Sequence, residues 1–170
     1  MPLPYLEPET LRAAVADDPF WSASLDAVLA ADPAPRALHL AILVEPYMGL
    51  ILAGQKRIEA RFSVHRRAPF EQVHPDDVLL LKRSSGPILG IGRVDRVRCL
   101  ALAPEDLDDL RTRYANELCV DDPRFWRQRA TARYATLIWV SQVSPIAPLW
   151  VPKRDRRAWV VLRARGALRE

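Results

Sequence analysis

Apolar residues recur at two different spacings along this chain, and the change in spacing separates a helical beginning from a strand-rich remainder. Up to residue 30, two apolar stripes follow the spacing of amphipathic helices. The first stripe holds Leu11 and Val15, and the second holds Trp21, Leu25, Val28 and Leu29. Two prolines, at 33 and 35, then interrupt the pattern. We therefore expect residues 1–36 to form a helical N-terminal extension, packed on the rest of the chain or on a second copy of it.

From residue 38 onward, short apolar runs bounded by turn residues predict strands. The expected strands cover residues 38–44, 56–63, 78–82, 88–97, 134–143 and 158–162. Between them, the sequence predicts helices at 46–53, at 104–118 and from 124 to 129 or beyond, and a proline-rich crossing at 144–152. Helices and strands in one chain of 170 residues predict a single α+β domain, residues 37–170, behind the extension.

A charged turn and strand follow the expected 46–53 helix. Gly54 supplies the left-handed position that commonly ends a helix. Strand alternation buries the even-numbered residues of 58–62 and turns the odd-numbered residues of 57–61 to the opposite, solvent-accessible face. Lys56 lies in the turn, so its side chain can reach the side of Glu59. The segment is either a charged surface strand with weak ion pairs or a functional site.

The composition argues against several classes of protein. Cys99 and Cys119 are too few for a disulfide scaffold, and His39, His65 and His74 lack the spacing of a metal site. We expect no metal and no cofactor. No segment approaches the roughly 18 apolar residues of a membrane span, and the first residues lack the basic and apolar parts of a leader. We expect a cytoplasmic protein without a membrane partner.

The positive charge of the chain is unevenly distributed. The formal net charge is +4, but residues 1–35 hold six acidic side chains and one arginine, so the remaining residues carry +9. Residues 56–98 alone hold ten basic side chains and five acidic ones. This clustering favours a polyanionic partner such as nucleic acid, while a merely solvated basic face is the alternative.

A longer pattern surrounds the charged segment. Glu45-Pro46-Tyr47 precedes Ile51–Arg61, and the segments 74–82 and 86–94 and the pair Phe125-Trp126 follow. Together these residues resemble ASCH domains, small β-barrels of the PUA-like superfamily that are associated with RNA, DNA and modified nucleosides. The resemblance spans residues 38–162. It implies a small mixed β-barrel flanked by helices for residues 37–170.

The resemblance implies a binding cleft for nucleic acid, with RNA favoured over DNA, or for a modified nucleoside. In this hypothesis Tyr47 stacks on a base or ribose, Lys56 and Arg61 meet phosphate, and Glu59 accepts a hydrogen bond from an amine or a 2′-hydroxyl. The candidate binding residues are Tyr47, Lys56, Arg57, Arg61, Arg66, Arg67, Lys82 and Lys153.

The alternative function is a hydrolase. Some ASCH proteins are amidohydrolases that act on acetylated cytidine with a lysine, a threonine three positions later and a glutamate on a helix, and others are described as ribonucleases. Here Lys56 matches the lysine, Glu59 replaces the threonine, and Glu117 is the candidate glutamate. A lysine beside a carboxylate in a partly closed cleft is a useful acid–base pair, because each shifts the pKa of the other.

A third hypothesis assigns the chain to protein interaction. In this hypothesis the acidic N-terminal helices dock a protein partner or a second copy of the chain, and the barrel is not catalytic.

Overall fold

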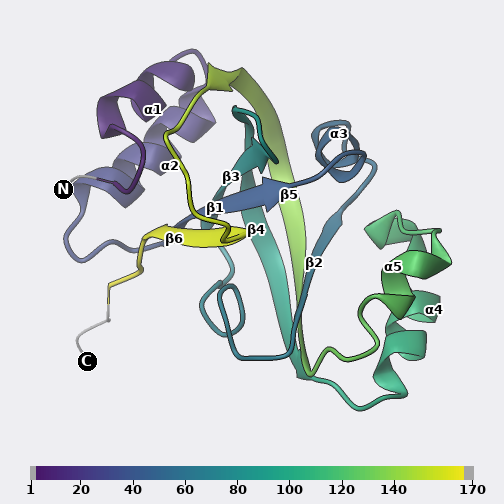
Figure 1. The fold of residues 1–170 in the computed structure, drawn as a ribbon. Coiled ribbons are helices and arrows are strands. Elements are labelled where there is room, and N and C mark those ends of the chain that lie inside the picture. Colours follow the sequence, from purple (N-terminus) through teal and green to yellow (C-terminus); the bar gives the residue numbers. More distant parts are fainter. Residues whose placement is uncertain (1–2, 167–170) are drawn as a thin grey trace.

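The computed structural model describes residues 3–166, which form five helices and six strands (Figure 1). The helices are α1 (Pro8–Ala14), α2 (Pro19–Ala30), α3 (Tyr47–Leu52), α4 (Asp106–Leu118) and α5 (Pro123–Arg127). The strands are β1 (Leu38–Leu43), β2 (Ile58–Ser63), β3 (Val78–Arg83), β4 (Ile88–Ala101), β5 (Tyr134–Leu149) and β6 (Trp159–Arg163). Every helix and strand expected from the sequence is present, with ends that differ by a few residues. None of the helices within residues 3–166 is long and apolar enough to cross a membrane.

The six strands form one mixed sheet in the order β2-β5-β4-β3-β1-β6. β1 and β3 are parallel, and the other neighbouring pairs are antiparallel. The sheet curls into a half-barrel, which brings its two edge strands, β2 and β6, toward each other (Figure 1). The predicted fold class, an α+β protein built on a small mixed barrel-like sheet with flanking helices, is confirmed.

The proline-rich segment 144–149 is part of β5 and not a crossing, which corrects the prediction from sequence. This part of β5 pairs with the first residues of β4, where Pro145 lies opposite Gly90. β2 pairs only with residues 134–139, so within residues 3–166 no strand occupies the other edge of β5 here. A proline that faces an open edge loses no sheet hydrogen bond.

Gly90 is needed for packing, because a Cβ atom there would lie 2.6 Å from Leu52 Cδ2 and 3.3 Å from the Ser144 oxygen.

The N-terminal helices pack on the sheet. Asp18 caps α2 by accepting a hydrogen bond from the Trp21 amide at 3.1 Å. The apolar stripes of both helices then join one core cluster with β1, β3, β4 and β6. From the extension this cluster contains Leu3, Leu6, Leu11, Val15, Trp21, Leu25, Val28 and Leu29. The helices of the extension were expected to pack on the rest of the chain or on a second copy, and in this structure they pack on the chain's own sheet. The domain boundary at residue 36 stays a prediction.

A second layer of helices covers the other end of the sheet. α4 and α5 lie beside β2 in Figure 1, and they share a core cluster with β2 and β5. Trp126 is buried in this cluster, as expected for a core aromatic residue. Phe125 is only partly buried, and its ring faces Tyr47 and Phe62 in edge-to-face contacts.

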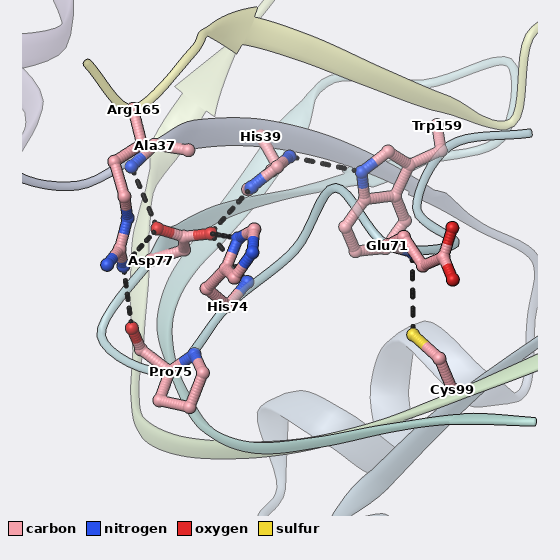
Figure 2. A network of polar contacts seen from close by, with 9 residues as sticks. All are labelled: Ala37, His39, Glu71, His74, Pro75, Asp77, Cys99, Trp159 and Arg165. Carbon is pink, nitrogen blue, oxygen red and sulfur yellow. Dashed lines mark hydrogen bonds and ion pairs between the residues drawn. The ribbon is translucent and has the colours of Figure 1, made fainter. Parts of the chain in front are cut away.

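A buried polar network joins β1 to the loop before β3. The Asp77 carboxylate accepts hydrogen bonds from the amides of Ala37 and His74, both at 2.8 Å, and from Arg165 Nη2 at 3.0 Å (Figure 2). His39 Nε2 lies 3.1 Å from the same carboxylate. His39 and Asp77 are both inaccessible to solvent. The carboxylate therefore satisfies donors from four separate positions, which makes it a structural centre of the core.

The same network reaches Trp159 at the start of β6. The Trp159 indole donates to His39 Nδ1 at 3.2 Å, so Nδ1 is the acceptor and Nε2 carries the hydrogen that faces Asp77 (Figure 2). The assignment of this neutral tautomer follows from the hydrogen bonds. Trp159 is thereby held in a fixed orientation beneath the residues that close the half-barrel.

Replacing Asp77 with asparagine is expected to destabilise the protein by about 2 kcal/mol, because the amide leaves buried donors unsatisfied. Burial raises the pKa of Asp77, but the hydrogen bonds from His39, Ala37, His74 and Arg165 lower it more, so the pKa lies below its ordinary value. The charged carboxylate therefore stabilises the fold above about pH 4, and this stabilisation is lost as the pH falls through the folded-state pKa.

Urea denaturation between pH 2 and pH 7 measures this effect, and the Asp77→Asn variant should show a flatter acid dependence. Asp76→Asn is the matched control, because Asp76 is about half exposed and pairs with Arg93 at 2.8 Å. The control should change the free energy of unfolding by less than about 0.5 kcal/mol. Equal losses in the two variants would contradict a structural role for the Asp77 network.

Candidate nucleic-acid interface

A hollow of about 1110 Å³ opens where the two ends of the curled sheet meet. β2 forms one wall, and the end of β1 with the segment 153–159 forms the other. Eight of the lining side chains are basic and two are acidic: Lys56, Arg61, Arg67, Lys82, Arg129, Lys153, Arg156 and Arg157, with Glu59 and Asp155. Four aromatic side chains also line it: Tyr47, Phe62, Phe125 and Trp159. Such a mixture of positive charge and aromatic surface suits an anionic ligand with flat rings.

Lys56 is held at the bottom of the turn between α3 and β2. Gly54 has a φ of 71° and ends α3, and the amides of Gln55 and Lys56 both donate to the Leu50 carbonyl. The Lys56 ammonium donates to the Leu118 carbonyl at 2.7 Å, at the C-terminal end of α4, where the helix dipole favours a cation. Only 4% of the residue is exposed. Burial lowers the pKa of Lys56, and the neighbouring Glu59 carboxylate opposes this only in part.

Glu59 lies between two cations. Its carboxylate is 3.8 Å from Lys56 Nζ and 2.8 Å from Arg61 Nε. The Nε–H group is not aligned for a hydrogen bond, so the second contact is an ion pair. The sequence placed Glu59 on a solvent-accessible face, but only 8% of the residue is exposed, which corrects that prediction. The reason is the curl of the sheet, which turns this face of β2 toward the opposite wall.

Arg61 closes the half-barrel. Its guanidinium donates to the Ile42 carbonyl at 2.9 Å and to the Ala158 carbonyl at 3.1 Å, and it lies 5.3 Å from the centre of the Trp159 ring. These bonds join β2 to β1 and to the residue before β6, at opposite ends of the sheet order. Arg61 thus contributes charge to the hollow while most of its hydrogen bonding is used by the protein itself.

The other predicted residues divide into two groups. Arg67, Lys82 and Lys153 line the hollow. Lys82 donates to the carbonyls of Arg83 and Gly86, and its pKa is lowered by burial and then by the charge of Lys153. Lys82 therefore holds the turn between β3 and β4 as well as adding charge.

Three predicted residues lie outside the lining of the hollow. Arg57 and Glu117 form an ion pair at 3.5 Å, and Glu117 is not brought to the ammonium of Lys56. Arg66 lies 3.9 Å from Glu71, with its guanidinium above the rings of Phe70 and Tyr134. The structure thus brings Tyr47, Lys56, Glu59 and Arg61 together and leaves Arg57, Arg66 and Glu117 apart from them.

Several lining residues were not singled out in the sequence. Thr136 lies directly opposite Arg61 in the pairing of β2 with β5, and its buried side chain faces the same hollow. Arg129 donates to the Phe125 carbonyl and stacks 3.4 Å from the centre of that ring. Thr136 gave no signal, because strand register is set by tertiary pairing. Arg129 did give a signal in the sequence, because it lies at the end of a predicted helix that also carries Phe125.

The fold and the hollow define a class: an α+β half-barrel protein with a basic, aromatic site at the seam of its sheet. No protein-family model and no curated protein matches this sequence. The structure is similar to that of ASCH from Zymomonas mobilis, with a TM-score of 0.60 and 16% identity over 75% of this chain and 89% of that chain. A point mutant of that protein matches with a TM-score of 0.60 and 18% identity over 76% and 90% of the two chains. The fold is therefore the ASCH fold, and the resemblance predicted from the sequence is confirmed at that level.

Proposed function

We propose that this protein binds single-stranded nucleic acid, with RNA favoured, or a modified nucleoside, in the hollow around Lys56, Glu59 and Arg61. One observation carries the proposal: a hollow of about 1110 Å³ is lined by eight basic side chains, two acidic ones and four aromatic rings. Basic grooves with aromatic surfaces are the common solution for binding unpaired nucleotides. Because sites define function and folds do not, the proposal rests on this lining.

The individual groups suit different parts of a nucleotide. Tyr47 and Phe125 offer ring surfaces at the edge of the hollow, and Arg67 and Arg156 offer charge for phosphate. Glu59 keeps acceptor capacity beyond its two cationic partners, since a carboxylate has about four lone-pair positions. It is the group that would accept a hydrogen bond from an exocyclic amine or a 2′-hydroxyl.

Fluorescence anisotropy with labelled single-stranded RNA and DNA at several salt concentrations tests the proposal. We expect binding at low salt and a linear fall of log K with log salt, with a slope of about −0.7 for each phosphate neutralised. Competition by unlabelled nucleosides then separates a polymer site from a nucleoside site. The proposal is wrong if neither polymer binds at low salt and no nucleoside, modified or not, is bound in calorimetry.

A hydrolase is the second candidate, favoured by the buried amine of Lys56. A lysine with a lowered pKa, beside a carboxylate, loses its proton at a lower pH than an ordinary lysine and can then act as a base. Thr136 adds a hydroxyl group to the same hollow. Glu117, the third group expected from the sequence, lies outside the lining, so the proposal depends on Lys56 and Glu59.

Incubation with acetylated cytidine and with labelled RNA tests this second candidate. We expect turnover that increases with pH as the Lys56 amine loses its proton and that disappears in Lys56→Met. Product formation no greater than in a heat-killed control, for both substrates, would exclude these two hydrolase activities while leaving the binding proposal intact.

A further inference from the structure

Trp150 is the tryptophan that the fold leaves in solvent. The chain has five tryptophans, and Trp21, Trp126, Trp139 and Trp159 are each no more than 9% exposed, whereas Trp150 is 73% exposed. An indole ring that is exposed to water does not contribute the stabilisation that burial of such a large apolar group normally gives to the fold. Exposed aromatic rings of this kind are typical of binding surfaces.

Trp150 is outside the lining of the hollow but lies three residues before the segment 153–159, which forms one of its walls. The residue before it, Leu149, pairs with Ile88 at the start of β4, so the antiparallel direction carries Trp150 toward the turn between β3 and β4. Ser84 and Ser85 of that turn line the hollow. The chain then continues from Trp150 into the segment 153–159, which forms one wall of the hollow. The chain therefore leads to the hollow on both sides of Trp150, through the paired β3–β4 turn and through the segment that follows.

The segment that follows Trp150 is a rigid, basic loop built around Asp155. The Asp155 carboxylate accepts hydrogen bonds from Tyr5 at 2.6 Å, from Lys153 at 3.0 Å and from the Arg157 side chain at 3.0 Å. These hydrogen bonds hold the pKa of Asp155 well below its usual range, and the bond from Arg157 has the largest effect. The loop is therefore fixed by its own acid and by the N-terminal extension.

Two arginines of this loop have no such partner. Within residues 3–166, the guanidinium groups of Arg154 and Arg156 make no hydrogen bond and no ion pair, and both residues are exposed. Arg156 also lines the hollow. Free arginines on either side of Asp155, four and six residues after an exposed indole in the sequence, complement the charge and the flat bases of a polynucleotide.

We propose that Trp150, Arg154 and Arg156 form a track that guides a single-stranded polynucleotide into the hollow, with Trp150 stacking on a base and the arginines meeting phosphates. This inference rests on the proposed function and extends it, because it assigns the protein a polymer ligand in which the nucleotide in the hollow is one of several contacted. A free nucleoside in the hollow has no need of Trp150 or Arg154, which lie outside its lining.

The first test compares a single-stranded RNA of about eight nucleotides with a mononucleoside, using Trp150→Ala. We expect Trp150→Ala to weaken RNA binding by about tenfold to a hundredfold and to leave nucleoside binding unchanged. Phe20→Ala is the matched control, because Phe20 is also exposed, at 42%, but lies on α2 outside the hollow. RNA should also protect the wild-type protein from fluorescence quenching by iodide, since Trp150 is the accessible tryptophan.

The second test measures the salt dependence of RNA binding. The double variant Arg154→Gln/Arg156→Gln should reduce the magnitude of the salt slope by about 1.4, the value for two phosphate contacts to a single strand. The charge-matched control Arg111→Gln/Arg113→Gln, on exposed positions of α4, should leave the slope unchanged. The same measurement with single-stranded DNA shows whether the track distinguishes the two polymers.

The outcomes separate the track from the site. If RNA binds the wild-type protein and both Trp150→Ala and the arginine double variant bind it equally well, the track is wrong and the proposed function stands. If a nucleoside binds as tightly as the RNA, the track is again wrong. If neither RNA nor nucleoside binds, both proposals fail.

Discussion

Replacing Glu59 with glutamine is expected to destabilise the fold by about 3–5 kcal/mol, the usual cost of removing one partner from a buried ion pair. The Glu59 carboxylate is the counter-charge for two cations, at 3.8 Å from Lys56 Nζ and 2.8 Å from Arg61 Nε. Glutamine preserves the size of the side chain and removes its charge. The variant therefore leaves the buried Lys56 ammonium and the partly buried Arg61 guanidinium side by side, with the repulsion between them uncompensated.

Urea denaturation at neutral pH measures this loss, and Glu117→Gln is the matched control. Glu117 pairs at 3.5 Å with Arg57, which is largely exposed, so the control should cost less than about 0.5 kcal/mol. Adding Lys56→Met to Glu59→Gln should restore part of the lost stability, because one of the two cations is then gone. A Glu59→Gln variant as stable as Glu117→Gln would show that the charges in the hollow are well solvated.

The arrangement of helices and strands could be predicted from the sequence because each element is defined by local spacing. The stripe from Trp21 to Leu29 has one helical face, and the structure buries that face on the sheet. Local spacing did not predict the extent of a strand where that extent depends on pairing with a distant strand. The continuation of β5 through Pro145 depends on the open edge beyond the end of β2, and no local pattern indicates where a neighbouring strand stops.

The charged motif at 56–61 could be found in the sequence, but its geometry could not. Alternation along an isolated strand places Glu59 and Arg61 in solvent, and the curl of the sheet reverses this by bringing the opposite edge over them. The carbonyl partners of Arg61 are 19 and 97 residues away, at Ile42 and Ala158. Hydrogen bonds between such distant positions follow from the closure of the sheet, which no local spacing encodes.

This closure explains why one small segment serves both the fold and the proposed site. Arg61 and Lys82 donate hydrogen bonds to backbone carbonyls, whereas Arg154 and Arg156 donate none within the described residues. Basic residues of the seam are therefore of two kinds. The first kind is hydrogen-bonded to the protein's own backbone and adds positive charge to the hollow, and the second is available to a ligand.

Replacing Lys56 with methionine is expected to separate stability from binding. The variant should unfold within about 1 kcal/mol of the wild-type protein, because the loss of the hydrogen bond to Leu118 is offset by removal of a buried charge, and Glu59 keeps Arg61 as its partner. RNA affinity should fall by about tenfold to a hundredfold, the value of a hydrogen bond made by a charged group. Anisotropy and urea denaturation on the same samples measure both quantities.

The pH dependence gives an independent check on Lys56, and its sign follows from the lowered pKa. In the wild-type protein the unfolded state binds more protons than the folded state between the lowered pKa of Lys56 and its ordinary value of about 10.4, so stability rises with pH across that window. RNA affinity should fall across the same window as the ammonium is lost. Lys56→Met should weaken both trends and leave only the part that Lys82, whose pKa is also lowered, supplies. Arg66→Gln, which removes one exposed charge outside the hollow, should retain both. If Lys56→Met binds RNA with wild-type affinity and wild-type pH dependence, the hollow around this amine is not where the ligand binds.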